Sequence, residues 1–362
     1  MKLLFITPKP VIGGAEKITA LVAKRMAQKG HATHFACMCD PGEKWGIELD
    51  NTITKVSLGT GIRAILNLAT RLRKMQYDAV FSSFLDINLI LLALKPLCPK
   101  TSIIIRDALS LEFSHQLTIS PPIAKWMSRL LYRQADIHIA QTQEMAESNR
   151  NFLGDWCKPI IVHNPIGMDA KSASRGFPQK PILFLSVGRL TEQKGFRNLV
   201  DAFVSAHQLL PSIKLKIVGD GEQLEVLLKQ INKGNASNYI SIDPRQQDLS
   251  KYYSTADAYI LSSNHEGFCN TALEALAHGV PLIASTRNTG TSSFANHMEH
   301  GILIPSNDAA TITKGILDLH ENYEKFSQLS ISHSTTSKFN TARILDQYEA
   351  IILSTQHEPG KD

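Results

Sequence analysis

The stretch ADAYILSSNHEGFCNTALEALAHGVPLIAST (residues 256–286) contains, in order, a strand, a loop, a helix and a second strand. ADAYILSS and PLIAST are apolar enough for buried strands, and good helix formers run from about Asn270 to Gly279. Nearly continuous apolar strands joined by helices indicate a parallel sheet that is covered on both faces. The same alternation recurs along the chain and predicts an α/β fold.

One segment interrupts this alternation. PIGMDAKSASRGFPQK (165–180) is rich in Pro, Gly, Ser and Lys, so we place a domain boundary there. We predict two doubly wound Rossmann-like domains, residues 1–165 and 166–337, that face each other across a cleft, and a C-terminal helix at 338–356. Ligands of such domains bind beyond the carboxyl ends of the strands. The other predicted strands are 2–7, 31–38, 78–83, 102–107, 135–142, 159–164, 181–188, 213–220 and 239–242.

The composition is that of a globular, mildly basic protein. A chain of 362 residues favours two domains, and 43% hydrophobic with 20% charged residues argues against disorder. The net charge of +5 suits phosphate-bearing ligands or an anionic membrane surface. No basic run is dense enough for DNA and no nucleic-acid motif is present, so no nucleic-acid partner is expected.

Cysteine and histidine usage predicts no metal site. The five cysteines are an odd number without paired zinc spacing, which favours a reducing cytoplasm, and the histidines show no metal-ligand spacing. The N-terminus MKLLFITPKP is expected to be a buried strand rather than a signal peptide. The longest apolar stretch, residues 89–94, is too short to span a bilayer, so any membrane contact is expected to be peripheral.

Two acids flank the helix start in the opening stretch. Glu266 lies on the loop at a strand's carboxyl end, and the unpaired amides of residues 268–271 form a potential anion site with about half a positive charge. Glu274, one turn into the helix, is placed to accept hydrogen bonds from a pair of hydroxyls, such as those of a ribose. The alternative is an exposed loop acid and a surface helix residue.

A basic loop follows the first strand of the second domain. SVGRLTEQKGF (186–196) carries Arg189 and Lys194 between Gly188 and Gly195. Together the two cations would neutralise a diphosphate, including the charge it gains as a leaving group. The alternative is a solvated basic turn.

A glycine pair follows the first strand of the chain. In PVIGGAEK (10–17), Gly13 and Gly14 would let the backbone approach a phosphate closely. The segment is not a G-x-G-x-x-G dinucleotide fingerprint, and the alternative is a plain strand-to-helix turn.

In this order the segments resemble the retaining GT-B glycosyltransferases of family four, which build bacterial surface polysaccharides. The resemblance covers nearly the whole chain. It is carried by the glycine pair, the basic loop, IVGDGEQLEVLL (217–228), EGFCNTALEALAHGVPLIAST (266–286) and the domain link HNPIGMD (163–169). It implies the GT-B architecture, with a C-terminal helix that crosses back to the N-terminal domain.

The resemblance also implies the reaction. A hexose or N-acetylhexosamine would pass from a nucleotide-diphosphate sugar, foremost a UDP-sugar, to a glycan or polyprenyl-linked glycan acceptor, with retention of anomeric configuration. No metal or other cofactor is implied. The enzyme would serve lipopolysaccharide or other polysaccharide biosynthesis in the cytoplasm, at the inner face of the membrane. The alternatives are a sugar-nucleotide epimerase and a non-catalytic sugar-nucleotide-binding protein on the same fold.

Roles follow for individual residues by the same resemblance. Glu266, which would contact the donor sugar, and Arg189 and Lys194, which would bind its diphosphate, are the implied catalytic residues; Glu274 would bind the ribose. The implied donor site comprises Gly13, Gly14, Gly188, Arg189, Lys194, Glu266, Gly267, Phe268, Cys269, Asn270, Thr271 and Glu274.

The chain departs from the family pattern at two places. Where many relatives have a histidine after the strand at 102–107, this chain has Arg106 and Asp107, which become candidates for the acceptor side. In TRNTGTSSF (286–294), Gly290 is kept from a Gly-Pro-x-Glu element, but the Pro and Glu are not.

Two segments are basic and amphipathic. GIRAILNLATRLRKMQ (61–76) and PPIAKWMSRLLYRQ (121–134) combine apolar residues with Lys and Arg. Such helices bind anionic lipid, and the alternative is a pair of ordinary core-packed helices with solvated charges.

Overall fold

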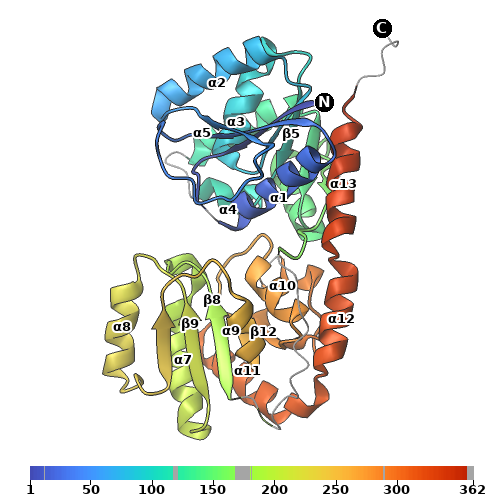
Figure 1. The fold of residues 1–362 in the computed structure, drawn as a ribbon. Helices are drawn as coiled ribbons and strands as arrows, with labels where there is room; N and C mark the ends of the chain where they lie inside the picture. Colours follow the sequence, from blue (N-terminus) through green and yellow to red (C-terminus); the bar gives the residue numbers. More distant parts are fainter. Residues whose placement is uncertain (12, 117–120, 168–179, 181, 288–289, 357–362) are drawn as a thin grey trace. The chain divides into compact units, whose positions relative to one another are not determined.

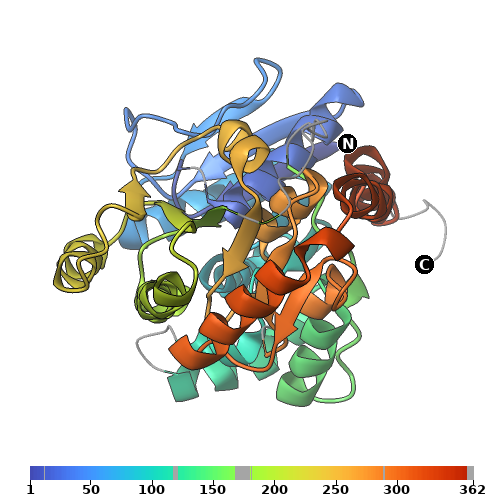
Figure 2. The same ribbon diagram turned by 90° about the horizontal axis from the view of Figure 1, so that it is seen from below.

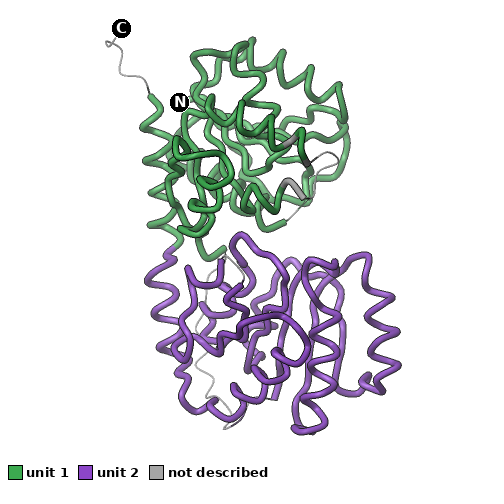
Figure 3. The backbone as a smooth tube through the Cα atoms, turned by 180° about the vertical axis from the view of Figure 1, so that it is seen from behind, with its two compact units in different colours: residues 1–167, 341–362 green, residues 168–340 purple. Residues whose placement is uncertain are grey.

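The computed structural model describes residues 1–362 except 12, 117–120, 168–179, 181, 288–289 and 357–362 (Figure 1). The chain forms two compact units, which are coloured separately in Figure 3: residues 1–167 with 341–362, and residues 168–340. Most of the predicted boundary segment, 165–180, lies outside the described residues.

Unit 1 is built on a seven-stranded sheet in the order β3-β2-β1-β4-β5-β6-β7, and every paired strand is parallel. The strands are β1 (Lys2–Thr7), β2 (Ala32–Cys37), β3 (Thr54–Ser57), β4 (Ala79–Ser82), β5 (Ser102–Arg106), β6 (Ile137–Ala140) and β7 (Ile160–Ile161). The helices are α1 (Gly14–Gln28), α2 (Gly61–Met75), α3 (Leu85–Leu94), α4 (Leu111–Gln116), α5 (Pro121–Leu131), α6 (Gln143–Leu153) and α13 (Thr341–Leu353). β1, β4 and β5 are almost wholly buried, which explains their continuous apolar sequences.

Helix α13 belongs to unit 1 although it lies at the other end of the chain. Arg25 of α1 forms ion pairs with Asp346 and Glu349, the latter at 3.1 Å. The buried hydroxyl of Tyr348 accepts a hydrogen bond from Arg106 Nε at 3.0 Å. These contacts, together with the buried side chains Ile344 and Ile352, attach the helix to the first unit.

Unit 2 repeats the architecture on a six-stranded parallel sheet in the order β10-β9-β8-β11-β12-β13. α7 packs beside α11, and α10 beside α12, and helices cover both faces of the sheet (Figure 2). The strands are β8 (Leu183–Val187), β9 (Lys214–Val218), β10 (Ile240–Asp243), β11 (Ala258–Leu261), β12 (Leu282–Ser285) and β13 (Gly301–Ile304). The helices are α7 (Phe196–Leu209), α8 (Leu224–Lys233), α9 (Ser250–Thr255), α10 (Asn270–Ala277), α11 (Ala309–Glu321) and α12 (Gln328–Lys338).

The predicted doubly wound α/β architecture is confirmed, with three corrections to its elements. Strands β3 and β13 were not predicted: each has only four residues, and β3 carries a single strongly apolar side chain, Val56. The predicted tail helix at 338–356 is wrong in its bounds. Lys338 ends α12, whose many Ser and Thr residues hide its helical character, and α13 begins at Thr341.

Candidate active site

Unit 2 has a topological switch point between β8 and β11. From β8 the chain proceeds outward to β9 and β10, and it then returns to the other side of β8 as β11. The connections that leave these two neighbouring strands diverge, which opens a crevice at their carboxyl ends. The loops 188–195 and 262–269, which contain the predicted basic and acidic residues, both start at this edge.

The two loops are joined by backbone and side-chain hydrogen bonds. The Asn264 amide donates to the Gln193 carbonyl at 2.8 Å, and Ser262 Oγ donates to the Lys194 carbonyl at 2.8 Å. Gly195 has a left-handed backbone (φ +64°), and a Cβ atom there would collide with the carbonyl oxygen of Ser262. Only glycine fits where the loops touch.

Lys194 and Glu266 form an ion pair in this crevice. The Lys194 ammonium donates to Glu266 Oε1, which also accepts from Ser263 Oγ at 2.7 Å. The Lys194 and Glu266 side chains are only 18% and 9% exposed. Burial disfavours the charged ammonium, but the Glu266 carboxylate more than compensates and raises the pKa of Lys194. The charge of Arg189, which follows Gly188 at the end of β8, also reaches Lys194.

Helix α10 begins beside this pair. Cys269 is its N-cap residue, and no side chain makes a capping hydrogen bond there. Burial raises the pKa of the Cys269 thiol to about 11, so the sulfur is protonated near neutral pH and is no nucleophile. Thr271 Oγ1 is hydrogen-bonded to the Tyr259 hydroxyl at 2.8 Å. An anion bound here would therefore accept hydrogen bonds from the main-chain amides of Cys269 and Thr271 rather than from their side chains.

Glu274 lies inside the unit. It is 3% exposed, and its Oε2 accepts a hydrogen bond from the buried Tyr253 hydroxyl at 3.0 Å. The alternative that it is a surface helix residue is wrong. Tyr253 lies on α9, outside every predicted motif, and holds the carboxylate in one orientation. The predicted ribose contact of Glu274 stays a prediction.

Gly13 and Gly14 lie in unit 1, at the start of α1. Gly13 is the N-cap residue, and a Cβ atom there would collide with the carboxylate of Glu16. A side-chain acid therefore already lies at this helix N-terminus. The predicted contact of the glycine pair with a phosphate stays a prediction.

Arg106 does not lie on a surface that an acceptor could touch. It ends β5 with 1% of its surface exposed, and its guanidinium donates to Tyr348 and Asn164. Its proposed acceptor-side role is therefore corrected to a structural one. The sequence hid this because the partners lie 242 and 58 residues away.

Asp107 is the centre of a buried polar network. Its Oδ2 accepts from His138 at 2.6 Å and from Asn149 at 2.7 Å, and its Oδ1 accepts from Tyr132 at 3.0 Å. Burial disfavours a charged imidazole, but the Asp107 carboxylate outweighs it and raises the pKa of His138 to about 9. The carboxylate is thus fixed by three donors and paired with an imidazolium.

This pair predicts a pH-dependent stability of unit 1. The pKa of His138 rises from its unfolded value of about 6.5 to about 9, so the stabilisation is fully present below pH 6.5 and is lost as the pH rises through 9. We expect the difference in unfolding free energy between the wild type and His138→Gln to shrink between pH 6 and pH 10. Urea titrations of both proteins at several pH values measure it, and a constant difference would contradict the pairing.

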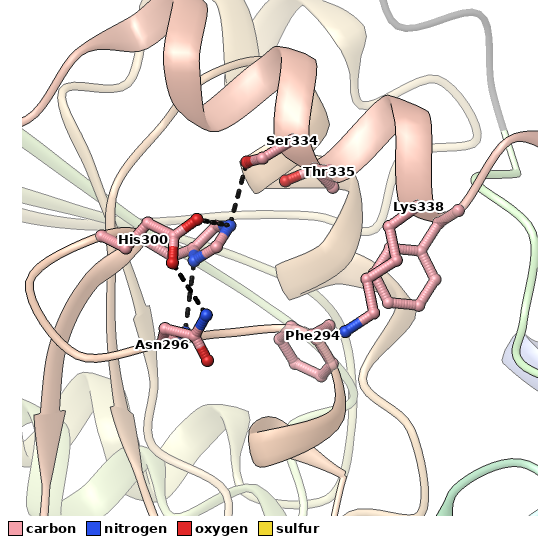
Figure 4. Close-up of a pocket in the computed structure, with 8 residues that line it drawn as sticks. Phe294, Asn296, His300, Ser334, Thr335 and Lys338 are labelled. Carbon is pink, nitrogen blue, oxygen red and sulfur yellow. Dashed lines mark hydrogen bonds and ion pairs between the residues drawn. The ribbon is translucent and has the colours of Figure 1, made fainter.

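Each unit contains a cavity. In unit 2 a cavity of about 110 Å³ lies between the 294–300 segment and α12, where His300 contacts Asn296 and Ser334 (Figure 4). Two of its wall residues, Phe294 and Phe339, also pack against Phe268, with ring centroids 5.4 and 5.9 Å away. These two ring contacts pack the wall of the cavity against the loop that carries Glu266. Gly290 lies against the Gly267 carbonyl, where a side chain would collide.

In unit 1 a cavity of about 190 Å³ lies at the carboxyl ends of β4 and β5. Asp107 is among its lining residues. Within the described part of the chain, no group of three or more His, Cys, Asp or Glu side chains is arranged to hold a metal ion.

Comparisons with known proteins match both halves of the chain. The family model Glycosyltransferase Family 4 matches residues 12–169, and Glycosyl transferases group 1 matches residues 167–332. The lipopolysaccharide core biosynthesis glycosyltransferase LpsE of Rhizobium meliloti is 28% identical over 240 residues, which cover 64% of this chain and 68% of LpsE. For other curated relatives the match spans about half of their length, 42 to 54%.

Solved structures show the same fold. Sucrose-phosphate synthase of Thermosynechococcus elongatus superposes with a TM-score of 0.85 at 16% identity, over 98% of each chain. The Anabaena protein Alr3699/HepE, solved in complex with UDP-glucose, has a TM-score of 0.80 at 16% identity, over 98% of this chain and all of that one. At this identity the likeness establishes the two-domain GT-B architecture and nothing about the ligand.

Proposed function

We infer that this chain, which belongs to the group 1 glycosyltransferases and has the GT-B fold, transfers a hexose or N-acetylhexosamine from a UDP-sugar. The proposed acceptor is a glycan or lipid-linked glycan in surface polysaccharide biosynthesis, and the anomeric configuration is retained. LpsE, named for lipopolysaccharide core biosynthesis, supports this choice of pathway class. The choice of a UDP-sugar as donor rests on the family resemblance of the sequence motifs.

One observation carries the proposal: the Lys194–Glu266 ion pair lies at the switch point of unit 2. Arg189 is close to it, and the helix α10 begins next to Glu266 without a side-chain cap. Two cations and a helix N-terminus suit a diphosphate. A carboxylate beside them suits the hydroxyls of the attached sugar.

The proposed reaction is a substitution on one face of the sugar. The bond from the anomeric carbon to the diphosphate breaks as the bond to the acceptor oxygen forms, and the acceptor's hydroxyl proton passes to a departing phosphate oxygen. Arg189 and Lys194 stabilise the charge that develops on the diphosphate. Glu266 orients the donor sugar, and Tyr253 orients Glu274 for the ribose. No separate base and no metal ion are required in this scheme.

Nucleotide binding tests the proposal most directly. We expect UDP and at least one UDP-sugar to raise the melting temperature and to give a calorimetric binding signal in the presence of EDTA, because a ligand of the native state stabilises it. Arg189→Ala should weaken this binding about tenfold or more, since a diphosphate would lose a bidentate donor.

The panel also contains GDP and ADP, and Lys233→Ala, at the exposed end of α8, is the matched control that should bind like the wild type. Preference for another base would overturn the UDP assignment. Binding of a UDP-sugar without release of UDP in the presence of acceptors would favour the non-catalytic alternative.

We also propose that unit 1 contacts an anionic membrane through α5. Ile123, Trp126 and Leu130 are 59%, 66% and 54% exposed on this helix, and Lys125 and Arg129 lie among them. The segment 121–134 contains no acidic residue. An aromatic and aliphatic face bordered by cations is typical of interfacial helices. None of the helices in the described residues is both long and apolar enough to cross a bilayer.

The double substitution Trp126→Ala with Leu130→Ala is expected to lower binding to phosphatidylglycerol vesicles about tenfold or more, because it removes the inserted apolar surface. Co-sedimentation with these vesicles measures it. Leu329→Ala, at a leucine that is 69% exposed in unit 2, is the control. Equal binding of the double variant and the wild type would contradict membrane contact through α5.

A further inference from the structure

The unit 1 cavity lies where a ligand of a doubly wound domain is expected. Its walls come from the segment after β4, including Ser83 and Phe84, and from the segment after β5, including Asp107 and Leu109. These strands are parallel neighbours, so their carboxyl ends meet at one edge of the sheet. The volume of about 190 Å³ suits a single sugar ring rather than an oligosaccharide.

The cavity wall combines apolar and hydrogen-bonding groups. Phe84, Leu85 and Leu109 supply an apolar surface for the C–H face of a ring, and Ser83 and Ser114 supply hydroxyls. A mainly apolar wall with a few polar groups is the usual composition of a small-molecule site.

The charges of the cavity are all negative. None of its eight lining residues is a Lys, Arg or His. The carboxylate of Asp107 is compensated by His138 and by two further donors. Asp86 is exposed in the first turn of α3, and no hydrogen bond or ion pair links its carboxylate to a side chain in the described part of the chain. Asp86 is therefore the carboxylate at the cavity that no side chain of the described residues pairs.

We propose that this cavity binds a neutral sugar unit of the acceptor, with Asp86 accepting hydrogen bonds from its hydroxyls. The proposal deepens the proposed glycosyltransferase function and rests on it, because the bound sugar is an acceptor only if the chain transfers a sugar. A sugar that bears a carboxylate or a phosphate would meet the charge of Asp86 at close range, where like charges repel. Asp86 thus selects neutral over acidic acceptors.

Saturation-transfer NMR with simple glycosides tests the proposal without donor or turnover. The probes are the methyl α-glycosides of glucose, galactose and N-acetylglucosamine, with methyl glucuronide and methyl galacturonide as acidic counterparts. We expect the wild type to bind at least one neutral glycoside with a millimolar Kd, and its uronide at least tenfold more weakly.

Variants assign the effect to the cavity. Asp86→Asn should bring the neutral-to-acidic ratio close to one, and Asp86→Lys should reverse the preference. Asp155→Asn is the matched control, because Asp155 is exposed between α6 and β7, at the opposite edge of the sheet. It should keep the wild-type ratio.

Three results would overturn the proposal: no glycoside binds, glucoside and glucuronide bind equally to the wild type, or Asp86→Asn leaves the ratio unchanged. These outcomes are independent of the nucleotide panel, which reports on unit 2. Failure of the acceptor assignment and failure of the glycosyltransferase proposal are therefore distinguishable.

Discussion

Lys194→Ala is expected to lower kcat/KM for the UDP-sugar about a thousandfold. The ammonium would neutralise the departing diphosphate, and removal of one such donor typically costs about 10²–10³ in rate. It also neutralises Glu266, whose side chain is only 9% exposed. Removing it therefore weakens both the diphosphate site and the orientation of the carboxylate. Release of UDP from the donor, in the presence of the acceptor, measures the effect.

A double variant separates chemistry from folding. Lys194→Ala alone leaves a largely buried carboxylate without its ammonium, which costs about 1–3 kcal/mol of stability. Lys194→Met with Glu266→Gln removes both charges and should recover most of that stability while staying inactive. Lys233→Ala should match the wild type. Activity within a few fold of the wild type in Lys194→Ala would remove Lys194 from the site.

Asp107→Ala is expected to destabilise unit 1 by about 3–5 kcal/mol, a large share of the roughly 5–15 kcal/mol that stabilises a native protein. The substitution leaves the imidazolium of His138 without its counter-charge and the Tyr132 hydroxyl and Asn149 amide without their acceptor. Urea unfolding followed by a signal from unit 1, such as fluorescence of Trp156, measures the loss.

Asp107→Asn is the informative comparison. It keeps an acceptor oxygen but no charge, so its unfolding free energy should lie between those of the wild type and the alanine variant. The pH dependence of stability assigned to His138 should disappear. Asp155→Ala, at an exposed loop carboxylate, should be within about 0.5 kcal/mol of the wild type. If Asp107→Ala were equally neutral, the network would not stabilise the unit.

Strand and helix patterns were visible in the sequence where burial is nearly complete. β4 and β5 are buried along their whole length, so all their positions except Arg106 are apolar or small, and both strands were predicted. β3 and β13 escaped prediction because each is short and β3 lies at the sheet edge, where one apolar side chain suffices. α12 escaped prediction for another reason: its residues Ile331 and Thr335 are buried, but the helix is rich in Ser and Thr and so lacks a clear apolar face in the sequence.

Local sequence was enough to predict the α/β alternation and the two loops that carry Arg189, Lys194 and Glu266, because these depend on residues close together in the chain. The partners of each charged side chain, in contrast, follow from how distant segments pack. The Lys194–Glu266 pair spans 72 residues, and the Arg106–Tyr348 contact spans 242. A local pattern cannot contain such partners, since strand order and packing choose them. For that reason Arg106 became structural, Tyr253 and His138 were missed, and Asp86 was found only at the wall of a cavity.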